Sequence, residues 1–252
     1  MRYVPLTTFL LLLAGLPASA QIGPPQPRAE RHGYSLGVGV HNVQSRWMPY
    51  DYDVARNRIY FEGSYGFTDS VEAFGRAGVS DWVINDIESY RPGLTRDVST
   101  DGSPPAFLSG GLRGKAWQFG RWSIGGSLEA AWYSGLEKNV RWNYDVYQEL
   151  HFDSTVEITA ALSVGYDLGR SVVYGGPLLH FGYNRVDVRT HEFGPDWDVE
   201  DSVDALTIRD KGGCGGFLGW RTPIGENGWH LQLEGAGLRG GFAGALGFFR
   251  SW

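Results

Sequence analysis

The strongest constraint on the fold of this chain is a period-two alternation of apolar and polar residues that recurs in long segments. Residues 71–80 read VEAFGRAGVS: apolar and small side chains occupy every second position, and Glu72 and Arg76 lie among the intervening ones. Successive side chains of a β-strand point to opposite faces. The segment is therefore predicted to be a strand with one smooth apolar face and one face whose acid and base are close enough to pair.

Similar segments succeed one another to the end of the chain and predict an all-β fold. Ten strands are expected, at about residues 33–43, 57–67, 71–80, 106–117, 121–133, 155–166, 171–183, 206–220, 229–237 and 240–252. Short turns alternate with four long polar connections, at about residues 44–56, 81–105, 134–154 and 184–205. This rhythm is typical of an antiparallel up-and-down β-barrel with its long connections at one end. Eight strands is the alternative count.

Alternation alone does not say which face is outside, because a soluble barrel also alternates, with its apolar face inward. The alternating runs here reach about ten residues, the length that a tilted strand needs to cross a bilayer, whereas soluble strands typically have about five or six. Aromatic residues also gather at the ends of the apolar stripes, as they do at membrane interfaces. They are Tyr34, Phe67, Trp122, Tyr166 and Trp229 near the short turns, and Trp132 and Tyr183 near the long connections. A transmembrane barrel with its apolar face toward lipid is therefore predicted, and its closure would satisfy every backbone group in the bilayer.

The first 32 residues differ in composition from the rest of the chain. Residues 1–20 combine a basic start, an apolar run and the ending Ala18-Ser19-Ala20, which predicts a secretory signal peptide. A membrane anchor is disfavoured because the apolar run is too short to span a bilayer. Residues 21–32 contain three prolines and predict an extended, unpacked periplasmic arm. The barrel would then occupy residues 33–252.

Charge and cysteine content limit the possible partners. The formal net charge of −6 argues against nucleic acid. Cys214 is the single cysteine, so no internal disulfide can form, although the predicted export signal points to an oxidising compartment. Glycines surround Cys214 on both sides, and the alternation leaves open which way this strand faces.

The chain resembles the small outer-membrane β-barrel proteins of Gram-negative bacteria, of the OmpA-like and opacity-protein kind. Residues 66–69 read Gly-Phe-Thr-Asp and lead into Val71-Glu72, with Arg76 and Gly78 further along, which is similar to a strand–turn–strand signature of that family. Phe248 and Trp252 resemble its terminal aromatic assembly signal, although Arg250 stands where an apolar residue is usual. The resemblance implies the outer membrane as the location. It also implies lipid, lipopolysaccharide and the barrel-assembly machinery as partners.

The second face of the predicted strands carries charges of both signs, which a narrow lumen can hold as mutual ion pairs. The predicted lumen network comprises Glu72, Arg76, Arg113, Lys115, Glu129, Glu157, His180 and Glu234. A structural role for these residues is the simplest hypothesis, and no catalytic, cofactor or metal site is predicted.

Three functions are compatible with the sequence. The first is a barrel with a narrow or plugged lumen and long extracellular loops, with a structural or surface-interaction role. The second is a narrow porin-like channel for small solutes, and the third is a hydrolase with its active site at the barrel rim. The bulky and charged residues on the inward face favour the first, because small barrels have lumens that side chains nearly fill. The sequence does not identify a solute or a surface partner.

Overall fold

The computed structural model describes residues 22–25, 27–48, 52–85, 97–99, 104–141, 146–193, 199–210 and 213–252. Its strands are β1 (Tyr34–Met48), β2 (Tyr52–Thr68), β3 (Val71–Asn85), β4 (Asp97–Ser99), β5 (Ala106–Phe119), β6 (Trp122–Tyr133), β7 (Leu136–Arg141), β8 (Val146–Phe152), β9 (Thr155–Asp167), β10 (Val172–Phe193), β11 (Val199–Asp210), β12 (Gly213–Ile224), β13 (Trp229–Leu238) and β14 (Gly241–Ser251). Within these residues no helix is long and apolar enough to cross a membrane.

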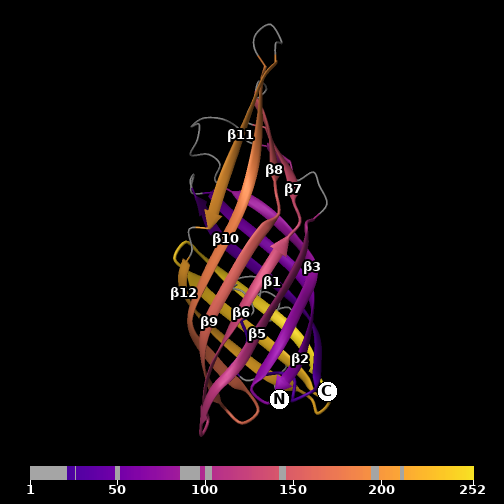
Figure 1. Cartoon of the computed structure of the whole chain (residues 1–252), viewed down its shortest axis with the longest axis vertical. Helices are drawn as coiled ribbons and strands as arrows, with labels where there is room; N and C mark the ends of the chain where they lie inside the picture. Colours follow the sequence, from indigo (N-terminus) through magenta and orange to yellow (C-terminus); the bar gives the residue numbers. More distant parts are fainter. Residues whose placement is uncertain are drawn as a thin grey trace, which may run out of the picture.

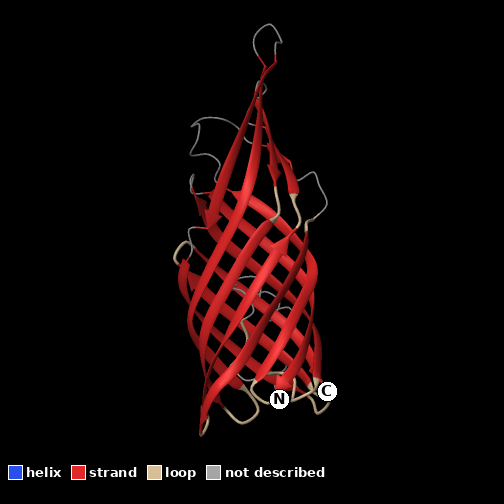
Figure 2. Ribbon diagram, viewed as in Figure 1, coloured by secondary structure: helices blue, strands red, loops and turns tan. Residues whose placement is uncertain are grey.

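Ten of the strands form a closed antiparallel barrel (Figures 1 and 2). Neighbours along the chain pair in the order β1, β2, β3, β5, β6, β9, β10, and the path continues through β12, β13 and β14. The pairing of β14 with β1 closes the ring. The predicted all-β barrel is therefore confirmed, with ten strands rather than eight. The C-terminus lies at the end with the short hairpins, here called the turn end (Figure 1).

The opposite end carries a β-sheet extension where the sequence predicted polar loops. β10 continues beyond the barrel and pairs with β8 and β11, and β7 pairs with β8 and β4. β1 and β2 likewise remain paired up to Trp47 and Tyr52. The long-loop prediction is wrong for these parts, because the strands pair through their backbones and Leu136, Phe152 and Val186 add buried apolar contacts where the extension meets the barrel. We call this end of the molecule the ribbon end.

The eighth predicted strand, 206–220, consists of parts of two strands. β11 ends at Asp210 and β12 begins at Gly213, whose φ of 102° turns the chain between them. Such a φ is readily adopted by glycine and rarely by other residues. Cys214 is exposed on the outer wall and Phe217 points inward, which settles the facing of this Gly-rich strand.

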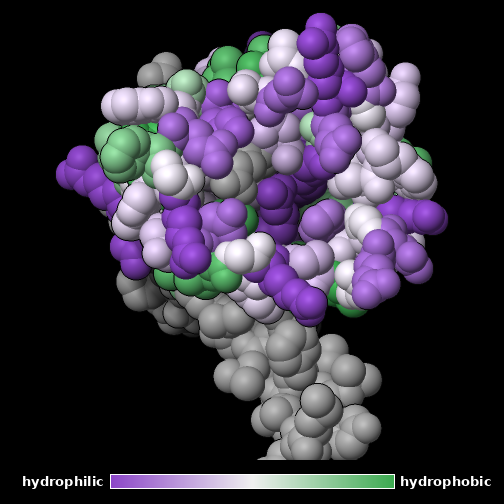
Figure 3. Space-filling model, turned by 90° about the horizontal axis from the view of Figure 1, so that it is seen from below, coloured by the Kyte–Doolittle hydropathy of each residue, from purple (hydrophilic) through white to green (hydrophobic). Residues whose placement is uncertain are grey.

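The apolar face of the barrel is outside, as predicted. Leu128 is 54% exposed whereas its neighbour Glu129 is 8% exposed. Ile158 and Glu157 differ in the same way, at 46% and 2%. Seen along the barrel from the turn end, hydrophilic residues gather around the middle of the face and apolar ones appear chiefly toward its edge (Figure 3). The molecule thus has an apolar outer wall and a polar lumen.

Aromatic side chains fill the lumen toward the ribbon end. Trp82, Phe107, Tyr133 and Phe152 belong to one buried cluster, which comes from the ribbon-end parts of β3, β5, β6 and β8. Phe107 and Tyr133 stack at 5.5 Å between ring centroids, and Trp82 meets the edge of Tyr133 at 6.0 Å. This cluster, the upper aromatic cluster, places buried rings from several strands in contact within the lumen.

Candidate functional site: a filled lumen

A neutral network of six charged residues fills the lumen toward the turn end. Arg76 binds Glu62 and Glu129 at 2.7 Å each, and Arg113 binds Glu62 at 2.7 Å. Arg113 also pairs with Glu72, and Glu62 also pairs with Arg28. The six residues, here called the lower network, are Arg28, Arg76, Arg113, Glu62, Glu72 and Glu129. Each desolvated charge therefore has an opposite partner, as burial requires.

Aromatic ring faces contact two of these guanidinium groups. Phe74 lies under both Arg76 and Arg113, with 4.7 and 4.8 Å from guanidinium carbon to ring centroid. Tyr60 lies 5.3 Å from Arg76 in the same way. A ring face attracts a cation and shields it from water at once, so the network is both paired and enclosed.

A second charged cluster lies next to the upper aromatic cluster. Glu157 pairs with Arg56, and it accepts hydrogen bonds from Arg58 at 2.7 Å and from the Tyr133 hydroxyl at 3.0 Å. Arg58 also lies 4.9 Å from the Tyr133 ring centroid. Polar and aromatic side chains thus close the upper lumen together.

The N-terminal arm, predicted to be unpacked, lies inside the barrel instead. Ile22 is 3% exposed and packs among Ala161, Tyr174 and Phe217. The backbone N–H groups of Ile22 and Gly23 each donate to Glu234 at 2.6 Å. The prediction of an unpacked arm is wrong because a Pro-rich segment needs partners for few N–H groups, and the lumen wall supplies them.

The second half of the arm is held as firmly as the first. The backbone N–H groups of Arg28 and Ala29 donate to Glu72 at 3.0 and 2.9 Å. The Arg28 side chain donates to Gln232 at 3.2 and 2.6 Å, and its guanidinium carbon lies 3.5 Å from the centroid of the Phe249 ring. Arg28 thus joins the arm to the lower network.

The structure brings the predicted lumen residues into three places. Glu72, Arg76, Arg113 and Glu129 lie together in the lower network. Glu157 belongs to the second cluster. Glu234 binds the arm and accepts further hydrogen bonds from the Tyr174 hydroxyl at 2.6 Å and from Gln232 at 2.5 Å.

Two predicted members of the network have other surroundings. β5 has a bulge between Lys115 and Trp117, which breaks the alternation of its side chains. Lys115 is half-exposed there and donates to Gln118 at 2.7 Å. His180 is buried, with 2.9 Å between its Nδ1 and the Thr159 hydroxyl oxygen.

The predicted lumen network omits charged residues that the structure buries, among them Glu62, Arg58, Arg56 and Arg28. Glu62, Arg58 and Arg56 follow the inward alternation of β2 together with Tyr60, so extending that pattern would have found them. Arg28 lies outside any strand, and nothing in the alternation pointed to its position. Its place follows from the fold of the arm into the barrel.

Phe248 and Trp252 lie on the outer wall at the closing strand. Phe248 stacks on Trp229 with 4.6 Å between ring centroids. Trp252 exchanges backbone hydrogen bonds with Tyr34, at 3.0 and 3.3 Å, and so ends the β14–β1 pairing. Arg250 lies over the Trp252 ring at 5.0 Å, which shows how a cation is accommodated among these rings.

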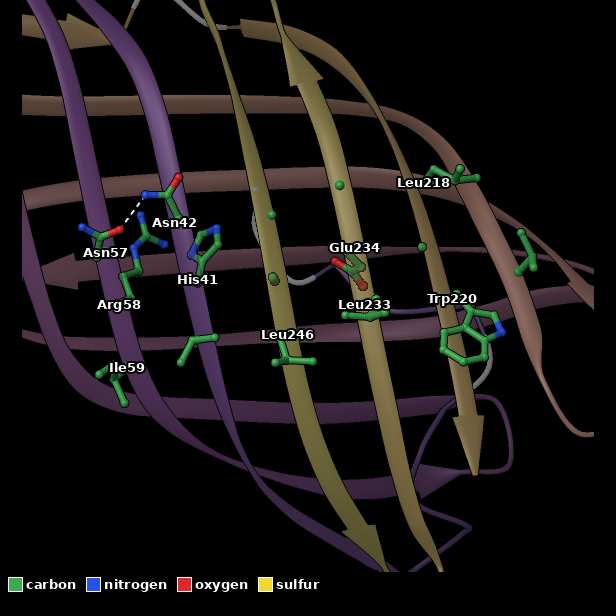
Figure 4. Close-up of a pocket in the computed structure, with 16 residues that line it drawn as sticks. His41, Asn42, Asn57, Arg58, Ile59, Leu218, Trp220, Leu233, Glu234 and Leu246 are labelled. Atoms are coloured by element: carbon green, nitrogen blue, oxygen red, sulfur yellow. Dashed lines mark hydrogen bonds between the residues drawn. The ribbon is translucent and has the colours of Figure 1, made fainter. Parts of the chain in front are cut away.

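A pocket of about 740 Å³ is lined by residues of β1, β2, β10, β12, β13 and β14 (Figure 4). Its lining includes the inward-facing His41, Arg58 and Glu234 as well as apolar residues of the outer wall. Gly235 and Gly244 pair there and present no side chain. Asn42 and Asn57 are hydrogen-bonded to each other at 2.5 Å beside it. Most of the remaining outward side chains around it are apolar.

A closed barrel with an apolar outer wall and a charged lumen is the fold of outer-membrane β-barrel proteins. No protein-family model matches the chain, and no characterised protein matches its sequence. Among solved structures, the β domain of the Bordetella autotransporter BrkA has a TM-score of 0.48 at 12% identity, covering 88% of this chain and all (100%) of that one. The outer membrane protein OprG from Pseudomonas aeruginosa has a TM-score of 0.42 at 10% identity, covering 89% and 98%. At these values the matches do not bear on function.

Proposed function

We propose that this protein is an exported outer-membrane β-barrel whose lumen does not conduct, with a structural or surface-interaction role. The observation that carries this proposal is that the lumen is filled at two levels. The arm and the lower network occupy the turn-end half, and the upper aromatic cluster with Arg56, Arg58 and Glu157 occupies the ribbon-end half. Barrels of this size have little room beyond their side chains.

The β-sheet extension supports a role at the cell surface. In the proposed orientation the turn end faces the periplasm, and β4, β7, β8, β11 and the far part of β10 stand outside the membrane. A sheet extends rigidly from its barrel, so it would present a partner with a fixed surface. The outer wall would contact lipid and lipopolysaccharide, and the strand that ends at Trp252 would be the segment that the assembly machinery reads.

Planar-bilayer recording of the refolded protein tests the proposal. Heat-modifiable migration on a denaturing gel first establishes that the barrel is folded. We expect no steady conductance above that of the bilayer, because both halves of the lumen are occupied. Steady single-channel steps from the intact protein would overturn the proposal in favour of the narrow-channel alternative. We also expect no hydrolase activity, so turnover of a lipid or peptide substrate by the same preparation would favour the third function.

A further inference from the structure

The contacts that hold the N-terminal arm are those of a peptide-binding site. Two pairs of successive backbone N–H groups each meet one buried carboxylate, one pair at Glu234 and the other at Glu72. Both carboxylates belong to the barrel wall and are distant in sequence from the arm. We propose that the turn-end lumen is a receptor for a bent cationic peptide segment, whose successive N–H groups converge on a carboxylate, and that residues 22–25 and 27–29 occupy it as an intramolecular ligand.

Backbone contacts alone would accept many sequences, but one side chain makes the site selective. Arg28 pairs with Glu62, donates to Gln232 and lies against the face of Phe249. A planar guanidinium satisfies a carboxylate, an amide oxygen and a ring face at the same time, which a lysine ammonium does not do equally well. The class of ligand is therefore a bent peptide segment with an arginine.

The wall is shaped to leave room for the arm. A Cβ atom on Gly165 would lie 2.8 Å from the Ser123 hydroxyl oxygen and 3.1 Å from the Pro25 ring. One on Gly125 would lie 2.0 Å from the Gly114 carbonyl oxygen and 2.8 Å from the Pro25 ring. Side chains at these two inward positions would therefore collide with the wall as well as with the arm. Pro25 needs no hydrogen-bond partner for its nitrogen, so it can cross this smooth part of the wall at no cost.

Charge explains why the ligand should be cationic. The lower network holds three guanidinium groups against three carboxylates, and Arg28 is one of the three cations. If the arm leaves, two cations face three carboxylates, and Glu234 also loses two of its donors. An excess of carboxylate around the vacated site favours another cationic segment in the same place and disfavours an anionic one.

Thiol labelling of the full-length protein tests whether the arm is seated as proposed. Ala29→Cys is placed in a Cys214→Ser background, because Cys214 is exposed. Ala29 is 2% exposed whereas its neighbour Glu30 is exposed, so Glu30→Cys is the matched control. A membrane-impermeant maleimide should label the control quickly and the Ala29→Cys protein slowly. Equal labelling rates would overturn the proposal.

The selectivity for arginine is tested in the same background. Adding Arg28→Ala to Ala29→Cys should speed labelling by about 10- to 100-fold, the effect of losing hydrogen bonds to charged groups. An excess of a synthetic peptide with the sequence of residues 22–33 should also speed labelling, by competing for the lumen, and the same peptide with Arg28→Ala should do so poorly. No effect of either change would show that the arm is merely packed and that the lumen is not a receptor.

A variant without residues 21–32 provides an independent measurement. If it shows heat-modifiable migration, the fluorescently labelled 22–33 peptide should bind it, and the Arg28→Ala peptide should bind about 10- to 100-fold more weakly. Equal affinities would count against the receptor. This inference and the proposed function can fail separately, because a conducting intact protein contradicts the latter, whereas an accessible arm contradicts the former.

Discussion

At the scale of single residues, Glu62 determines how the turn-end lumen is held together. Its carboxylate meets three guanidinium groups, those of Arg28, Arg76 and Arg113. These come from the arm, from β3 and from β5, so one side chain on β2 joins three other segments. Removing any of its partners would leave buried charge without full compensation, which is costly in a medium of low polarity.

Arg113 and Lys115 lie two positions apart on β5 and give a matched pair of tests. Arg113→Ala removes a partner of both Glu62 and Glu72 and should lower the free energy of unfolding by about 3–5 kcal/mol. Lys115→Ala should change it by no more than about 0.5 kcal/mol, because Lys115 is half-exposed at a bulge. Urea titration followed by gel shift measures both. A similar midpoint for the two variants would show that the network does not stabilise the barrel.

The alternation of the sequence predicts which side chains face the lumen, but it cannot predict which of them meet across it. Glu72, Arg76 and Glu129 were assigned inward correctly from period two alone. Their contacts depend on the tilt and closure of the barrel, which bring β2, β3 and β6 together. The alternation also failed at Lys115, where one extra residue in the strand resets the pattern.

At the scale of strands, a glycine on one strand makes room for a tyrosine on the next. Gly39 on β1 is paired with Tyr60 on β2, and a Cβ atom on Gly39 would lie 2.5 Å from the Tyr60 ring. Phe107 meets that ring edge-on at 6.0 Å, and Arg76 lies beside it. Because the ring is confined on these sides, it cannot move away easily.

Gly39→Ala should therefore destabilise the barrel by about 1–3 kcal/mol, the usual cost of overpacking a core. Gly75→Ala on β3 is the control, since Gly75 faces outward and the nearest atom to an added Cβ is 3.7 Å away. Gly75→Ala should leave stability unchanged or slightly higher, because alanine restricts the unfolded chain more than glycine does. Thermal gel shift compares the two. An equal loss of stability in both variants would mean that the destabilisation comes from replacing a strand glycine, and not from the limited space around Tyr60.

Strand positions followed from the sequence more closely than strand ends did. The apolar stripe ends where the outer wall ends, so a prediction based on that stripe stops there as well. β10 has 22 residues in all, and its far part pairs through the backbone with β8 and β11. Val186 and Val188 lie on the inward side there and Asp187 on the outward side, so the outward apolar stripe gives no signal for this part.

At the scale of the whole molecule, the side on which the apolar residues lie decides whether the outer wall of the barrel faces lipid or water. Ala130 and Ala131 on β6 are neighbours, with Ala130 exposed on the outer wall and Ala131 6% exposed in the lumen. Each can be changed to Cys in the Cys214→Ser background and labelled with the same fluorophore. Both substitutions are small, so differences in fold should be minor.

Brominated lipid should quench the probe at Ala130→Cys strongly and the probe at Ala131→Cys weakly, because a bromine atom quenches at short range from the acyl chains. Reconstitution in unbrominated lipid serves as the reference. Stronger quenching at position 131 than at position 130 would mean that the apolar wall does not face lipid. The barrel would then be a soluble one, with its outer wall in water.

The seating of the arm has a consequence for the order in which the chain folds. Ile22 lies 212 positions before its carboxylate partner Glu234, and Arg28 lies 204 positions before its partner Gln232 on the same strand. Contacts that close such long loops form late, because the intervening chain must be ordered first. β13, which carries Glu234 and Gln232, must therefore join the sheet before the arm can complete its contacts. The arm is thus among the last segments to reach its final position. Until then Glu72 and Glu234, which bind its N–H groups, are exposed to water inside the incomplete barrel.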